Sequence, residues 1–334
     1  MTKRIIFGST EPMIHNVFMM SIILENEGQK VSAMPVKVFM YHDIRDYKAT
    51  EFGRHFSERY QLRSFISTNT FIEQIHKIKN ESEIISSRDL LRLKGGDTGS
   101  YSVLTFDDGL LDHYKIQKIL SDENVIGTFF LPCEAITKRI VMRSHKIQFI
   151  LSATEETSIV SYINDKLLDD SLWKAYSKSK VKDNWWSPEM VFITNILRNH
   201  SRGKELTDKL FNTFVTSDEE AFCDEFYLNL DLIKKMLDNG MEIGGHGYVS
   251  ENLSNMTTLE TEKDIQNSTN FTQLFNKKNL LFSYPNGGYN ETVERCLKKY
   301  NYDLCFTTEQ QIFNTPVFNH LRVPRWDAAQ DGSL

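Results

Sequence analysis

The chain has 334 residues, of which 40% are hydrophobic and 25% are charged, so it is long and apolar enough for a full globular core. Its formal charge of −6 at pH 7 argues against a surface that binds nucleic acid or an anionic membrane. The four cysteines form no Cys-x-x-Cys pair, which favours reduced thiols over disulfides or a structural zinc site. No stretch approaches the roughly 20 apolar residues of a membrane span, and the N-terminal apolar run is too short for a signal peptide. We therefore expect a cytoplasmic protein without a membrane span or a nucleic-acid partner.

Residues 1–34 are the least informative part of the sequence, and we expect them to pack as a segment on the domain formed by residues 35–334. The apolar run at 36–43 predicts a strand that ends in polar groups. Apolar residues at helical spacing then predict a helix at 65–79.

A continuous apolar and β-branched run at 102–106 leads into Asp107, Asp108 and Gly109. Runs of this kind are typical of parallel strands that are buried on both faces. The two carboxylates would then lie at the carboxyl end of a buried strand, where α/β proteins place their chemistry. A bound cation is the usual compensation for two adjacent like charges, whereas an ordinary Asp-Gly turn is the alternative for this motif by itself.

After Gly109 the pattern is helical to about residue 123, and an apolar run at 127–132 then ends in proline, which predicts a parallel βαβ unit. The stretch at about 140–225 lacks strand-like repeats and is rich in charge, so we expect a mostly helical insertion that could roof an active site. Its aromatic residues could stack on a sugar, but packing within the insertion is the favoured interpretation. Three tryptophans belong to this group: Trp173, Trp185 and Trp186.

Strands and helices alternate again after the insertion. Helices are predicted at 231–239, 258–275 and 291–299, and strands at 241–246, 280–285, 302–307 and 320–323. We therefore predict an α/β fold, a distorted (β/α) barrel of about seven parallel strands with a helical insertion.

Polar groups follow four of the predicted strands, and the carboxyl ends of parallel barrel strands face one rim. They are Asp107 with Asp108, His246, the turn at 283–290 and the segment 322–327. Carboxylate and imidazole brought together at one rim are suitable ligands for zinc or a similar divalent ion.

These motifs resemble those of the polysaccharide deacetylase family, the NodB-homology hydrolases of carbohydrate esterase family four. The sequence LTFDDG at 104–109 resembles the first family motif, IGGHGYVSENLS at 243–254 the second, and FSYPNGGYN at 282–290 a variant of the third. The segments at 40–42, 128–131 and 322–325 are also similar to parts of some members. The resemblance spans roughly residues 35–330 apart from the insertion.

The resemblance implies a role for each matching residue. Asp107 would be the general base that takes a proton from a metal-bound water, while Asp108 and His246 would be metal ligands. A backbone N–H near Asn286 would help to stabilise the tetrahedral oxyanion. His320 is the preferred donor of a proton to the leaving amine, because an acid must reach that nitrogen.

The alternatives for these roles lie near other strand ends. His42 and His145 are the other histidines that could protonate the amine. Arg322 or Arg325 could keep Asp107 ionised, bind an acidic sugar or phosphate, or form a structural ion pair.

The sequence departs from the family pattern at two positions. Ser250 stands where a second metal-binding histidine usually follows the first by four residues, and a hydroxyl is a poor zinc ligand. The metal could be held by two protein ligands and water, another side chain could replace the histidine, or the site could lack a metal. The possible replacements are His42, His145 and Glu251. Ser283 stands where many members carry an arginine that pairs with the base.

The function that follows is a metal-dependent hydrolase, with zinc as the expected metal, that removes an N-acetyl or other N-acyl group from an amino sugar. The expected substrate is a nucleotide-linked, lipid-linked or oligosaccharide N-acylated sugar in surface-polysaccharide or glycoconjugate biosynthesis. Two alternatives remain: a barrel that binds a glycan or a protein partner without turnover, which Ser250 suggests, and a metal-independent amidohydrolase on the same fold.

Overall fold

The computed structural model describes residues 34–46, 66–94, 99–169, 171–176, 187–315 and 318–329. The predicted N-terminal segment, apart from Met34, and two of the three tryptophans of the insertion, Trp185 and Trp186, lie outside these residues.

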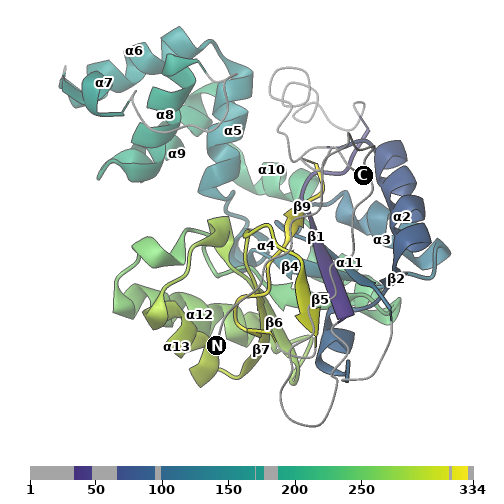
Figure 1. Ribbon diagram of the computed structural model, residues 1–334. Helices are drawn as coiled ribbons and strands as arrows, with labels where there is room; N and C mark the ends of the chain where they lie inside the picture. Colours follow the sequence, from purple (N-terminus) through teal and green to yellow (C-terminus); the bar gives the residue numbers. More distant parts are fainter. Residues whose placement is uncertain are drawn as a thin grey trace, which may run out of the picture.

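The described strands form one curved sheet in the order β7-β6-β5-β4-β3-β1-β8, with β2 paired to β3 and β9 to β1 (Figure 1). Every pairing is parallel except that of β8 with β1. The strands are β1 (Met34–Tyr41), β2 (Glu83–Ile84), β3 (Tyr101–Phe106), β4 (Gly127–Leu131), β5 (Glu242–Gly245), β6 (Leu280–Ser283), β7 (Tyr302–Phe306), β8 (Phe313–Thr315) and β9 (Trp326–Asp327). The predicted α/β fold with a distorted barrel is confirmed.

The predicted strand at 320–323 is wrong in detail, since this segment contributes only a parallel bridge between Val323 and Phe306. The Val323 N–H donates to the Cys305 carbonyl at 2.8 Å, and β9 then pairs in parallel with β1. The segment therefore connects β7 to β1 and carries Arg325 between the two. Its irregular backbone explains why an alternation pattern did not locate it correctly.

Helices cover the outer face of the sheet (Figure 1). They are α2 (Thr68–Glu81), α3 (His113–Asp122), α4 (Cys133–Lys138), α11 (Leu230–Asp238), α12 (Thr258–Thr272) and α13 (Glu291–Lys299), with 3-10 turns η1 (Ser87–Leu91), η2 (Leu253–Asn255) and η3 (Pro285–Gly287). Their starts follow from the sequence: Thr257 and Glu260 form a capping box on α12, and Asn290 caps α13 by accepting from the Val293 N–H. None of the described helices has the length and apolarity that a bilayer crossing requires.

The insertion is a lobe of helices beside the barrel (Figure 1). It contains α5 (Arg143–Ala153), α6 (Glu156–Leu167), α7 (Ser171–Tyr176), α8 (Pro188–Asn199), α9 (Gly203–Phe214) and α10 (Glu219–Phe226). Their apolar faces form a core of their own, which also includes Leu110 and Tyr227 at the junction with the barrel. Trp173 packs on Phe192 with ring centroids 4.9 Å apart, which supports the packing interpretation for this tryptophan.

Gly244 lets β5 pass close to its neighbours just below the predicted site. A Cβ at this position would lie 2.6 Å from the Phe130 ring and 2.7 Å from the Leu281 carbonyl oxygen.

We expect Gly244→Ala to lower the free energy of unfolding by about 1–3 kcal/mol, because Phe130 and Leu281 are too closely packed to move away from the added methyl group. Urea denaturation measures this change. Gly240→Asn is the control, since no atom lies within 4 Å of that Cβ and Asn tolerates the positive φ; equal losses in both variants would contradict the explanation.

Candidate active site

The carboxylate of Asp107, directly after β3, forms a buried two-bond ion pair with Arg325. The Arg325 Nη1 donates to Asp107 Oδ1 and the Nη2 to Oδ2, both at 2.8 Å. The Arg325 side chain is completely buried. This parallel arrangement is the strongest way for an arginine to hold a carboxylate. Of the two arginines considered from the sequence, it is therefore Arg325 that pairs with the predicted base.

Neighbouring strands fix the orientation of this arginine. Its Nε donates to the Thr307 carbonyl at 2.8 Å, and its Nη1 also donates to Thr105 Oγ1 at 3.2 Å. Ser283 accepts from Arg325 Nη2 at 2.8 Å and donates to Asp107 Oδ2 at 3.0 Å. The serine that replaces the family arginine thus joins the pair that Arg325 forms.

The surroundings of Asp107 determine its charge. Burial by itself would raise the pKa of this carboxyl, but Arg325 and the nearby His246 outweigh it and lower the pKa to about 2. Asp107 is therefore a carboxylate at neutral pH. Arg325 and Ser283 leave one acceptor position on Oδ1, because a carboxylate can accept about four hydrogen bonds.

Asp108 contacts two imidazoles, one with each carboxylate oxygen. His145 Nε2 lies 3.3 Å from Oδ2, and His246 Nε2 lies 3.4 Å from Oδ1. Burial opposes the charge of Asp108, but the two imidazoles lower its pKa well below the usual value. The backbone of Asp108 has a φ of 76°, a conformation that costs energy for a residue other than glycine and that is typical of functional sites.

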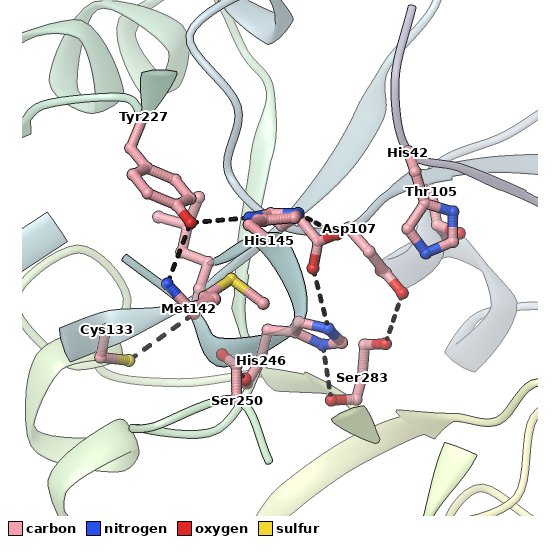
Figure 2. A network of polar contacts seen from close by, with 12 residues as sticks. His42, Thr105, Asp107, Cys133, Met142, His145, Tyr227, His246, Ser250 and Ser283 are labelled. Carbon is pink, nitrogen blue, oxygen red and sulfur yellow. Dashed lines mark hydrogen bonds and ion pairs between the residues drawn. The ribbon is translucent and has the colours of Figure 1, made fainter. Parts of the chain in front are cut away.

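The second nitrogen of each imidazole is held by the protein. His246 Nδ1 donates to the Ser283 carbonyl at 3.0 Å, which leaves Nε2 facing Asp108. His145 Nδ1 lies 2.6 Å from the hydroxyl of Tyr227, and that hydroxyl accepts from the Met142 N–H at 3.2 Å (Figure 2). Burial lowers the pKa of His246, but Asp107 and Asp108 outweigh it and raise the pKa above its ordinary value.

Ser250 does not face Asp108 in place of the missing histidine. Its hydroxyl donates to the backbone carbonyl of His246 at 2.7 Å. Glu251, another possible replacement, forms an ion pair with Arg143. Of the possible replacements, His145 is the one that contacts Asp108.

These groups line a cavity of about 170 Å³ whose wall includes His42, Asp107, Asp108 and Asn286. A larger cavity of about 960 Å³ adjoins it, between the insertion and the barrel loops, and Asn286 and Ser250 line both. Asn286 has a φ of 53° in the turn after Pro285, so the chain changes direction at this residue just after the end of β6.

Two predicted residues lie elsewhere. His320 is exposed and packs on Phe318, with ring centroids 4.5 Å apart, so the proton-donor role predicted for it is not supported. Arg322 pairs with Glu294 outside the cavity and is a structural ion pair.

Sequence reasoning missed the contribution of Thr105 and Tyr227. Thr105 is a β-branched residue in a strand, and Tyr227 lies outside every motif. No local signal distinguishes either of them from ordinary core residues.

Within the described part of the chain, no group of three or more His, Cys, Asp or Glu side chains forms a ready metal site. The donor chemistry of Asp108 and His246 nevertheless fits a divalent metal, since zinc takes carboxylate oxygen and imidazole nitrogen. The hydrogen bond from His246 Nδ1 to a backbone carbonyl is the usual support for an imidazole that binds a metal through its other nitrogen.

The polysaccharide deacetylase family model matches residues 204–305, a range that contains His246 and the turn after β6. The resemblance to polysaccharide deacetylases is confirmed. The predicted class, a hydrolase of amide C–N bonds, agrees with this family. No curated protein matches the chain.

Solved deacetylase structures share the fold over most of the chain. The Streptococcus pyogenes deacetylase PplD, in complex with acetate, is 15% identical, with 88% of this chain and 92% of PplD covered and a TM-score of 0.55. IcaB from Ammonifex degensii is 14% identical, with 87% and 91% covered and a TM-score of 0.51. At this identity the similarity establishes the fold.

Replacing Arg325 tests the buried ion pair. We expect Arg325→Met to lower the free energy of unfolding by about 3–5 kcal/mol, because it leaves Asp107 as an unpaired buried charge. Arg322→Met is the matched control, with an expected loss below about 1 kcal/mol for an exposed pair. Urea denaturation compares the two, and a small loss for Arg325→Met would refute the proposed dependence. Adding Asp107→Asn to Arg325→Met should recover part of the loss.

The lowered pKa of Asp107 predicts a difference in acid stability. Because its pKa in the folded state is about 2 and the unfolded value is about 3.9, the carboxylate stabilises the fold fully above pH 4. This contribution, about 2 kcal/mol, is lost as the pH falls through 2. We expect the free energy of unfolding to fall more steeply between pH 4 and 2 in the unaltered protein than in Asp107→Asn. Parallel curves would show that Asp107 has an ordinary pKa in the fold.

Proposed function

We propose that the protein is a metal-dependent N-deacetylase that acts on an N-acylated amino sugar. The observation that carries the proposal is the arrangement around the small cavity: Asp107 is held ionised by Arg325, and Asp108 and His246 lie beside it. A carboxylate base beside carboxylate and imidazole metal ligands is an arrangement that can hydrolyse an amide.

Asp108 and His246 would hold the metal. A bound divalent cation, with zinc as the proposed ion, would polarise the acyl carbonyl and lower the pKa of its water toward about 7. Asp107 would take the proton of that water through the open acceptor position on Oδ1. Arg325 and Ser283 keep this carboxylate in place, so that it does not turn toward Asp108 when the proton moves.

The leaving amine also needs a proton, and His42 is our proposed donor. It lines the small cavity together with Asp107 and Asp108, whereas the exposed His320 does not. Its Nδ1 is buried and has no hydrogen-bond partner among the described residues. An unpaired buried nitrogen beside the cavity supports a role of His42 in proton transfer in addition to packing.

The two cavities favour a saccharide substrate. The 170 Å³ space suits an N-acyl group, while the 960 Å³ space has room for at least one sugar ring beyond the reacting one. The larger wall is rich in side-chain amides, which can both donate to and accept from sugar hydroxyls. These amides belong to Asn195, Asn199, Asn252, Asn255, Asn267 and Asn286.

We therefore propose an oligosaccharide, or a nucleotide-linked or lipid-linked N-acetyl sugar, as the substrate. Its deacetylation would be a cytoplasmic step in surface-polysaccharide or glycoconjugate assembly. The acetate in the PplD structure is the acyl product that such a reaction releases.

A barrel that binds glycans without turnover is the second candidate, because Ser250 replaces a histidine and is turned toward the backbone. It predicts retained glycan binding without acetate release. A metal-independent amidohydrolase predicts release that chelators do not affect.

Acetate release from N-acetylated chitooligosaccharides, with zinc or cobalt added, tests the proposal. We expect turnover that Asp107→Asn lowers by about 10²- to 10⁴-fold, because the general base is lost. Asp122→Asn, an exposed carboxylate on α3, is the matched control and should leave the rate unchanged. Failure to release acetate from any N-acetyl sugar, or full activity of Asp107→Asn, would exclude the proposed reaction.

A further inference from the structure

We propose that His145, from helix α5 of the insertion, is the third metal ligand and replaces the imidazole that residue 250 does not supply. This inference rests on the proposed function, because it concerns the same metal. Among the replacements considered from the sequence, this choice makes the helical insertion part of the catalytic centre.

The first argument is the distance between the donors. Asp108 lies 3.3 Å from His145 Nε2 and 3.4 Å from His246 Nε2. A charge-assisted hydrogen bond would be about 2.7–2.9 Å long, so both contacts are longer than direct bonding favours. Two ligands at about 2.0–2.2 Å from a tetrahedral zinc are separated by roughly 3.3 Å. The separation of Asp108 from each imidazole is therefore the one expected of two donors that share a cation.

The second argument is the support of the His145 ring. Its Nδ1 meets the Tyr227 hydroxyl at 2.6 Å, as His246 Nδ1 meets the Ser283 carbonyl. A neutral hydroxyl can accept from an Nδ1–H, which leaves the lone pair of Nε2 directed at Asp108.

The third argument is that α5 holds this imidazole rigidly. His145 is buried and packs against the rings of Phe226 and Tyr227, with centroids 5.0 and 5.7 Å away. The next residue, Lys146, is anchored by Asp208 at 2.6 Å and by Glu219 at 2.8 Å. A rigidly placed ring is what a ligand position requires.

The other possible replacements do not compete for this position. The Ser250 hydroxyl donates to the His246 carbonyl at 2.7 Å. Glu251 is paired with Arg143 in the larger cavity. His42 lines the small cavity but forms no ion pair with Asp108 among the described residues.

Metal affinity of the full chain, measured without any substrate, tests the inference. Zinc is titrated against a chromophoric chelator, and cobalt binding is followed by its visible absorption. We expect His145→Gln to weaken binding by about 100-fold or more and to change the cobalt spectrum, because one of three protein ligands is lost. His76→Gln, an exposed histidine of α2, is the matched control and should bind as the unaltered protein does.

A rescue separates a ligand from a packing residue. Adding Ser250→His to His145→Gln supplies an imidazole four residues after His246, and we expect it to restore most of the affinity. Tyr227→Phe should weaken binding by about 10-fold, since it removes only the partner of Nδ1; this variant also covers the case in which His145→Gln does not fold.

The outcomes distinguish this inference from the proposed function. Unchanged affinity in both His145→Gln and Tyr227→Phe, with metal bound by the unaltered protein, would overturn the role of His145 and leave the deacetylase proposal intact. No metal binding by the unaltered protein would overturn both the ligand and the metal dependence.

Discussion

The site depends on one buried interaction, the two-bond pair of Asp107 with Arg325. A carboxylate buried in this way without a partner would lower the free energy of unfolding by several kcal/mol. The Arg325 guanidinium is therefore needed for a stable fold as well as for keeping Asp107 ionised. Arg325 lies on the segment that connects β7 to β1. The segment that balances the charge of Asp107 is therefore the same one that bridges to β7 and pairs with β1. The ion pair and the strand contacts of this segment thus stabilise each other.

Ser283 links the Asp107–Arg325 ion pair to His246. Its hydroxyl bonds to both members of the ion pair, and its carbonyl accepts from His246. A longer side chain in that position would compete with Arg325 for the carboxylate. The small serine is thus consistent with an arginine that comes from the irregular segment before β9, and together the two residues hold the carboxylate in its charged form.

The sequence could predict those parts of the site that follow directly from strand ends. Asp107, Asp108 and His246 come after apolar runs, and parallel strands bring their ends to one rim. Arg325 could be proposed as a site residue, but its burial against Asp107 could not be predicted, because it depends on the path of an irregular segment. The exposed position of His320 has the same cause, since the predicted strand there is a single bridge.

His145 was one of three possible replacement ligands considered from the sequence, and its position shows why the sequence pattern could not choose among them. A ligand at four residues from His246 is a local property of one loop, and a motif can record it. A ligand on α5 depends on how a whole helical lobe packs, through Tyr227 and Lys146, on the barrel. Metal chemistry fixes only the position and the direction of a nitrogen, not the element that supplies it. With the His145 imidazole held beside Asp108 by the helical lobe, residue 250 does not need to bind the metal. A serine at that position can instead donate a hydrogen bond to the His246 backbone.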